Sequence, residues 1–115
     1  MTLQPTVRSV VVPMAAEIDL TNREQVYDRL YAAFVSGVAV VIADFSATRF
    51  CDSASLRHLI AVQQRAAAHG CQLRLVIPAD SLVGRLADLL GLASQLLIYR
   101  SVGQASGHCL LSSAI

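Results

Sequence analysis

The feature that most constrains the fold is a short run, Val38–Ala43, that is apolar at every position and ends at Asp44. A strand of this composition is buried on both faces, as strands are in parallel sheets that helices cover on both sides. A turn that contains several polar residues follows as far as Asp52, and then apolar residues begin to recur at helical spacing. The chain is therefore predicted to fold around a buried strand, a polar turn and the start of a helix.

Strand-like and helix-like segments alternate around this centre. Further strands are predicted at the other β-rich runs, which are Val7–Val12, Gln72–Ile77 and Leu96–Tyr99. Helices with one apolar face are predicted in three segments, which lie between Thr21 and Gly37, from about Ser53 to His69, and between Asp80-Ser81 and Gly91. Alternation of this kind indicates βαβ units, so the predicted fold class is α/β.

Two of the predicted helices begin with residues that cap helices. Thr21 and Glu24 have the T-x-x-E spacing of a capping box, with Thr21 as the N-cap. Asp52 and Ser53 stand at the start of the second helix, where the first backbone N–H groups have no partner within the helix. The same place, after the carboxyl end of a strand, is where open α/β sheets present ligand or partner sites.

Composition excludes several classes of protein. Hydrophobic residues make up 55% of the 115 residues and charged residues 15%, which excludes a disordered chain. No apolar run is long enough to span a membrane, and the first residues lack the pattern of a signal peptide. The net charge is +1 and the nine basic residues, all arginine, are scattered, so no nucleic-acid partner is predicted.

The residues that carry chemistry do not form a recognised catalytic or metal-binding pattern. Ser53 lacks the two flanking glycines of a nucleophile elbow, and His58, five residues further along the same helix, is badly placed as its base. The cysteines Cys51, Cys71 and Cys109 show no metal-ligand spacing, so they are interpreted as free thiols. No nucleotide-binding glycine motif occurs. We therefore predict no enzyme activity, no metal and no cofactor.

Asp52 and Ser53 leave two interpretations open. The first is purely structural, since aspartate and serine before a helix are standard caps. The second is that Ser53 is phosphorylated as a switch. A helix N-terminus stabilises the added negative charge, whereas Asp52 repels it and a docked partner is displaced. Tyr27 and Tyr31, one turn apart on the first helix, likewise fit either a ridge that binds a partner or the edge of the core.

Three segments resemble a known family. Asp44–Ser46 together with Phe50–Leu56 is similar to the signature of STAS domains of the anti-sigma factor antagonist type, which reads D-x-S, a spacer, then a hydrophobic residue, x and D-S-[SA]-G-L. Ala16–Thr21 resembles the G-E-[IL]-D-x-x-[ST] segment of that family, and Leu90–Tyr99 resembles its G-L-x-x-x-hydrophobic ending. The resemblance covers about Val7 to Tyr99.

The resemblance implies one STAS-like domain over residues 1–115. Its core spans about residues 7–99, and residues 100–115 are expected to form a helix, a strand or a tail. The implied fold is a mixed, mostly parallel sheet of four to five strands with about four helices. Ser55 and Ala16 stand where the family has glycine, so Ser55 is expected either to clash with a partner's close approach or to offer a second hydroxyl, and the turn at Ala16 is expected to differ. The first strand is short, so one strand of the usual sheet is expected to be missing or replaced by the tail.

The resemblance also implies a function. Such proteins are bacterial, cytoplasmic regulators of transcription that bind an anti-sigma factor, which is also a serine kinase. Phosphorylation breaks the complex and a phosphatase restores it. Carried over by position, Ser53 is the phosphorylated residue, and the partner-binding residues are Asp52, Ser53, Ala54, Ser55, Arg57 and His58.

Two alternatives stay open at this point. Some STAS-like domains are subunits that dock on the ATPase of an ABC-type transport complex without being phosphorylated, or serve as other interaction modules. An enzyme that uses Ser53 is the third and least favoured hypothesis. The oligomeric state is left open by the sequence, with a homodimer as one alternative.

Overall fold

The structure of the chain is a computed structural model that describes residues 7–107 and the backbone of residues 109–111. The main sheet has five strands in the order β6-β5-β3-β1-β7. These strands are β1 (Val7–Pro13), β3 (Val40–Asp44), β5 (Gln72–Val76), β6 (Ile98–Tyr99) and β7 (Cys109–Leu111). The expected sheet of four to five strands is confirmed, and every pairing in the described residues is parallel rather than mixed.

A second, two-stranded sheet was not predicted from the sequence. It pairs β2 (Glu17–Ile18) in parallel with β4 (Phe50–Cys51) above the ends of β1 and β3. Both strands are two residues long, too short to produce the alternation by which strands are recognised. Their pairing joins the segment after β1 to the segment just before the helix that begins at Ser53.

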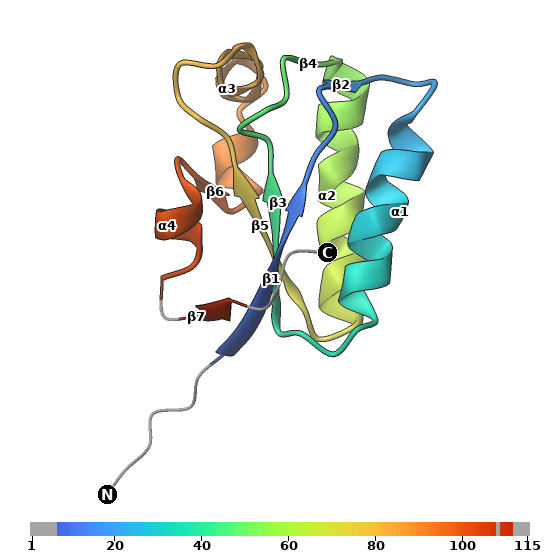
Figure 1. The fold of residues 1–115 in the computed structure, drawn as a ribbon. Helices are drawn as coiled ribbons and strands as arrows, with labels where there is room; N and C mark the ends of the chain where they lie inside the picture. The colour runs from blue at the N-terminus through green and yellow to red at the C-terminus, as the bar shows by residue number, and fades with distance from the viewer. Residues whose placement is uncertain (1–6, 108, 112–115) are drawn as a thin grey trace, which may run out of the picture.

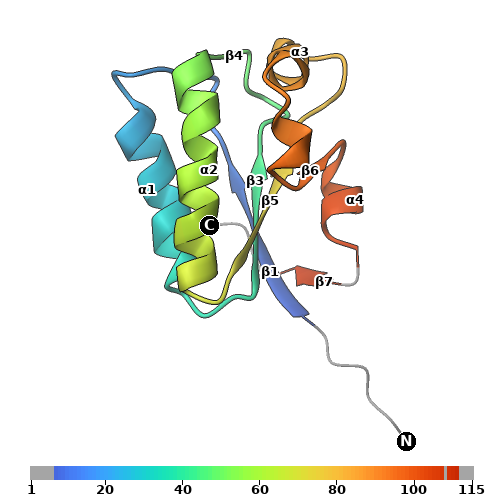
Figure 2. The ribbon, with the colours of Figure 1, turned by 180° about the vertical axis from the view of Figure 1, so that it is seen from behind.

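The helices lie on both sides of the main sheet (Figures 1 and 2). They are α1 (Arg23–Phe34), α2 (Ser53–Ala68), α3 (Leu82–Leu89) and α4 (Val102–Ala105), with a 3₁₀ turn η1 at Leu92–Ser94. α1 and α2 run side by side over one face, α4 lies on the other, and α3 lies at the end of the sheet beside β4. The α/β class and the number of helices are confirmed.

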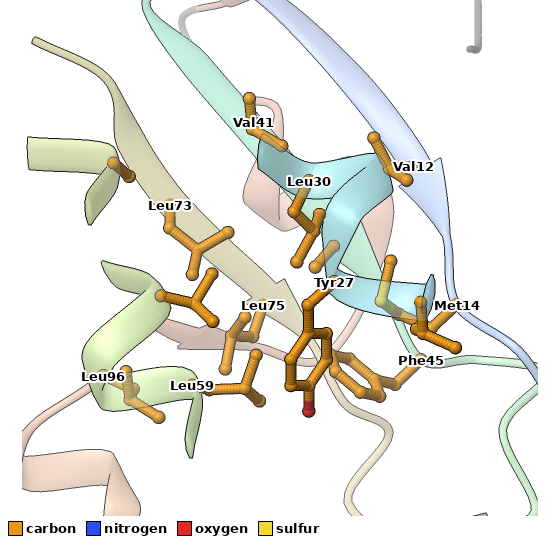
Figure 3. Close-up of a cluster of buried hydrophobic side chains, with 14 of the residues drawn as sticks. Val12, Met14, Tyr27, Leu30, Val41, Phe45, Leu59, Leu73, Leu75 and Leu96 are labelled. Atoms are coloured by element: carbon orange, nitrogen blue, oxygen red, sulfur yellow. The ribbon is translucent and has the colours of Figure 1, made fainter. Parts of the chain in front are cut away.

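The central strand β3 is buried on both faces, as its composition predicts. Val41 and Ala43 belong to the large core under α1 and α2, whereas Val40 and Ile42 join a smaller cluster toward α4. Figure 3 shows the large core, in which side chains from the strands, α1 and α2 meet. This sandwich fixes the position of the loops at the carboxyl ends of the strands.

The start of α1 differs from the predicted capping box. The N-cap is Asn22 rather than Thr21, and it forms no side-chain cap hydrogen bond. Thr21 instead donates its backbone N–H and its hydroxyl to the Asp19 carboxylate. Because Asp19 engages Thr21 in a local turn, that hydroxyl does not cap the helix, so the predicted cap was wrong.

The apolar faces of two helices also differ in part from expectation. On α2, Leu56, Leu59 and Ala66 are buried, whereas Ala67 is exposed. On α3, Leu82 and Leu89 are exposed, although an apolar residue of a crossover helix was expected to face the sheet. α3 lies at the end of the sheet, so only one side of it meets the core.

The C-terminal segment forms both of the elements that were considered for it. α4 packs on the sheet, and β7 pairs in parallel with β1, so the C-terminal segment supplies the edge strand of the sheet. The tail considered for the last positions falls on residues 112–115, which lie outside the described residues.

Candidate functional site

The helix α2 begins where β4 ends, and Asp52 is its N-cap. One carboxylate oxygen of Asp52 accepts a hydrogen bond from the Ser55 backbone N–H at 2.7 Å. The Ser55 hydroxyl, and after it this N–H, hold the pKa of the Asp52 carboxyl below its ordinary value. Asp52 is therefore an ionised cap that fixes the first turn of α2, as the sequence predicts for this position.

Ser53 is the first residue of α2 and is exposed. Among the described residues its hydroxyl has no hydrogen-bond partner. The neighbouring Asp52 carboxylate accepts its hydrogen bond from the Ser55 backbone N–H rather than from the Ser53 hydroxyl. Ser53 therefore presents a free hydroxyl at the positive end of a long helix.

Ser55 lies on the opposite side of the same turn and is 0% exposed. Its Oγ has no hydrogen-bond partner in the described part of the chain, although it lies close enough to the Asp52 carboxylate to lower the pKa of that group. The expectation that this side chain clashes with an approaching partner, or offers it a second hydroxyl, is not met, because Ser55 faces the core. The serine that replaces the family's glycine thus adds nothing to the outer surface.

The other partner-binding residues predicted around Ser53 are exposed. Ala54, Arg57 and His58 lie on the outside of α2. The His58 ring stacks on Tyr27 of α1, with ring centroids 5.9 Å apart and an angle of 3° between the planes. This stacking holds His58 against α1 rather than against Ser53. No contact with a partner is part of the structure, so the role of these residues stays a prediction.

Tyr27 is the residue whose role the sequence left most open. It is 1% exposed, and its hydroxyl donates a hydrogen bond to the Ser55 backbone carbonyl at 2.7 Å. Burial raises the pKa of the Tyr27 hydroxyl, and it also raises the pKa of the neighbouring Cys51 thiol to about 12. Tyr27 therefore joins α1 to the first turn of α2 from inside, and it lies in the core itself rather than at the predicted edge of the core with its hydroxyl in water.

Two aspartates shape the loops beside this helix start. The Asp44 carboxylate accepts hydrogen bonds from the Ser46 backbone N–H at 2.9 Å and from the Ser46 hydroxyl at 2.6 Å. Asp19 holds Thr21 in the same way, and the Thr21 hydroxyl is the main cause of the lowered pKa of the Asp19 carboxyl. The D-x-[ST] spacing of both segments thus encodes a turn that closes on its own side chain.

The pairing of β2 with β4 places the segment that contains Asp19 next to the segment that leads into Asp52 and Ser53. These two segments form the edge of the molecule that carries Ser53. Ile18 lies opposite Cys51, and the Asp52 backbone N–H donates to the Ile18 carbonyl at 3.1 Å. Leu20 and Phe50, at 75% and 49% exposure, belong to the same two segments. Sequence reasoning did not single out these two apolar residues, although each stands inside a stretch that resembles the family motif.

Comparison with known proteins decides the family. The STAS domain model matches residues 1–105. The chain belongs to the STAS domain family. No curated protein matches its sequence significantly. None of the helices in the described part of this STAS domain has the length and hydrophobicity that crossing a membrane requires.

Solved structures resemble the fold of this STAS domain. The NMR structure of the protein TM1081 has a TM-score of 0.67 at 19% identity, covering 84% of this chain and 78% of that one. The anti-sigma factor antagonist SpoIIAA in its unphosphorylated form has a TM-score of 0.64 at 20% identity, covering 90% and 89%. SpoIIAA described as a Bacillus cell fate determinant, in its phosphorylated form, gives 0.56 at 20% identity, covering 90% and 92%. At these identities the likeness concerns the fold.

Proposed function

We propose that this STAS domain is an anti-sigma factor antagonist that works by partner switching. In this proposal the unmodified domain binds an anti-sigma factor, which is also a serine kinase, through the edge that carries Ser53. Phosphorylation of Ser53 ends the binding, and a phosphatase restores it. The observation that carries the proposal is the free, exposed hydroxyl of Ser53 at the first position of α2.

The physical chemistry of this position supports a switch. A phosphate group adds about −1.5 to −2 charges, and a helix N-terminus stabilises such a charge by about 0.3–1 kcal/mol. The domain can therefore carry the phosphate without unfolding. The ionised Asp52 lies next in the chain, so the modified edge presents concentrated negative charge to the partner. A partner that fits a neutral hydroxyl loses affinity when it meets that charge.

The surroundings of Ser53 favour protein binding over catalysis. The exposed apolar side chains of Leu20 and Phe50 lie in the segments that pair at this edge, and exposed apolar surface marks sites of protein interaction. His58, the histidine closest in sequence, is stacked on Tyr27. The residues of the edge thus offer a surface and a modifiable hydroxyl rather than an acid–base pair.

The test compares two serine-to-aspartate variants for binding to the cognate anti-sigma factor. Ser53→Asp places a negative charge at the proposed switch and is expected to weaken the complex by about tenfold or more. Ser36→Asp is the matched control. Ser36 is also exposed, but it follows the C-terminal end of α1 and not the start of α2. Isothermal titration calorimetry measures both affinities.

Equal affinities for wild type, Ser53→Asp and Ser36→Asp would overturn the proposal. Selective co-purification of the wild-type chain with the ATPase of an ABC-type transport complex, independent of Ser53, would instead support a docking subunit of a transport complex.

A further inference from the structure

A cleft of about 570 Å³ lies between α1 and α2. The two helices lie side by side and run in the same direction, because each connects one strand to the next in a parallel sheet (Figures 1 and 2). Ser53 is not among the residues that line the cleft, so a test of the cleft needs neither a kinase nor an anti-sigma factor.

The α2 wall of the cleft presents two hydrogen-bond donors that tyrosines of α1 hold in place. The His58 ring stacks on Tyr27, and the Arg65 guanidinium lies over the Tyr31 ring, 3.9 Å from its centroid. Both His58 and Arg65 are exposed, and neither makes a hydrogen bond or an ion pair with any residue that the structure describes. Because Tyr27 and Tyr31 are about one helical turn apart, the two donors that they hold are about one turn apart as well.

The α1 wall carries the opposite charge. Glu24 and Asp28 line the cleft, are exposed and lie one turn apart. Neither carboxylate makes a hydrogen bond or an ion pair within the described part of the chain. Arg23, which also lines the cleft, lies near the ionised Asp52. An acidic row on α1 therefore stands beside a donor row on α2, with the same spacing and without contact between them.

This face is complementary to itself about one kind of two-fold axis. An axis that runs along the cleft, parallel to the helices, places α1 of one copy over α2 of the other and keeps every residue at its own height. The acidic row of each copy then faces the donor row of the other, and each residue's own counterpart lies further away, diagonally across the axis. An axis across the helices would set α1 against α1, and acid against acid. An isologous interface needs the first arrangement.

Apolar residues extend the match beyond the charges. Val35 is 66% exposed and lies seven residues after Asp28, so both are on the same side of α1. On α2, the exposed Ala61 and Ala68 are also seven residues apart, on the side that carries the two donors. Their short side chains let α1 of a second copy approach closely, and Val35 of one copy then packs near Ala68 of the other.

We propose that the outer face of α1 and α2 is a homodimer interface, with a second copy of this chain as its occupant. An occupant of this face must bring basic groups to α1 and acidic groups to α2, and the face does both for itself. Two helices of about 18 Å in length and 10 Å in width give a small footprint beside the roughly 800 Å² per partner of a standard interface. The dimer is therefore weak, and because exposed charges hold it, salt weakens it further.

Sedimentation equilibrium of the full chain, from micromolar to millimolar concentration, tests the interface. We expect a reversible monomer–dimer equilibrium for the wild type, with a dissociation constant at least about threefold higher in about 0.5 M than in about 0.02 M sodium chloride. Asp28→Arg and Arg65→Asp each set like charges opposite one another twice per dimer, and each is expected to raise the dissociation constant by about threefold to tenfold. Asp88→Arg and Arg85→Asp make the same changes at exposed positions of α3 and are expected to match the wild type.

Mixing the two cleft variants tests the pairing itself. In a dimer of one Asp28→Arg chain with one Arg65→Asp chain, both contacts again join opposite charges. The equimolar mixture is therefore expected to dimerise within about twofold of the wild type, although each variant alone is weak. The proposal is overturned by a wild type that stays monomeric at every concentration, by a dimer that is insensitive to salt, by α3 variants that weaken the dimer equally, or by a mixture as weak as its separate components.

Discussion

The outer and inner sides of the first turn of α2 carry the same residue type under opposite conditions. Ser53 faces solvent with a free hydroxyl, whereas Ser55, two positions later, is fully buried with a hydroxyl that has no hydrogen-bond partner in the described residues. Residues two apart on a helix lie on opposite sides, so one turn serves both the surface and the core. The difference teaches that the two serines of this turn are not equivalent, because Ser53 is exposed and Ser55 is not.

The inner side nevertheless supports the outer one through its backbone. The Ser55 N–H satisfies the Asp52 carboxylate, and the Ser55 carbonyl accepts the Tyr27 hydroxyl. The position of the exposed Ser53 is thus held by main-chain groups of its buried neighbour. Predictions that separate these roles follow, from the largest expected effect to the smallest.

The same substitution on both sides gives the largest contrast. Ser55→Leu forces a large side chain into the packed core and is expected to lower the free energy of unfolding by about 1–3 kcal/mol. Ser53→Leu adds the same atoms to the surface and is expected to change it by less than about 0.5 kcal/mol. Denaturant unfolding monitored by circular dichroism measures both values. Equal costs would contradict the assignment of the two sides.

Removing the Tyr27 hydroxyl tests the internal link between α1 and α2. Tyr27→Phe is expected to lower the free energy of unfolding by about 0.5–1.5 kcal/mol, because a buried hydrogen bond is lost. Tyr31→Phe is the control, since the half-buried Tyr31 makes no hydrogen bond through its hydroxyl within the described residues. Its unfolding curve is expected to overlay that of the wild type. An unchanged Tyr27→Phe variant would show that the link contributes no stability.

Removing the unpaired Ser55 hydroxyl is expected to help the fold. Ser55→Ala ends the burial of a hydroxyl without a partner and introduces a better helix former, so stability is expected to rise by about 0.5–1 kcal/mol. Ser55→Gly, which installs the residue typical of the family, is expected to be about 1 kcal/mol less stable than Ser55→Ala. Thermal unfolding compares the three chains. A destabilised Ser55→Ala variant would mean that the favourable effect of this hydroxyl on the Asp52 carboxylate outweighs the cost of burying it.

The charge on Asp52 is expected to give the smallest effect, and a pH-dependent one. A carboxyl whose pKa is lowered on folding contributes stability above its unfolded pKa of about 3.9, and this contribution is lost as the pH falls through the lower folded pKa. Asp52→Asn keeps the oxygen that accepts from Ser55 but loses the charge, so the cost at neutral pH is expected to be about 0.3–1 kcal/mol. The stabilities of the two chains are expected to converge as the pH falls below the lowered folded pKa of Asp52. A difference that is constant with pH would contradict the role of the charge.

The sequence predicted the elements that depend on strong local signals. Val40–Asp44 forms the buried strand because its first four residues are apolar on both faces. Asp52 caps α2 because its carboxylate accepts from the backbone N–H of the first turn. The start of α1 was mispredicted, since Thr21 belongs to two overlapping patterns, the T-x-x-E of a capping box and the D-x-T turn that Asp19 closes. A pattern of residue types does not say whether a hydroxyl accepts from a helix N–H or donates to a neighbouring carboxylate.

The rest of the site depends on contacts that no local pattern contains. β2 and β4 pair across more than thirty residues, and each is too short to show alternation. The burial of Ser55 follows from the packing of α2 in the fold, because a small polar residue at the border of an apolar face fits either side. The exposed leucines of α3 follow from its place at the end of the sheet. These features come from tertiary packing, which overrides local preference.

The most direct test of the switch is to map phosphate after the full chain is incubated with ATP and the cognate anti-sigma factor kinase. Peptide mass spectrometry is expected to find one phosphate, on Ser53, and none on the buried Ser55 or on the Ser53→Ala chain. A chain that remains unmodified, or that is modified at another residue while Ser53→Ala is labelled equally well, would contradict the proposed switch.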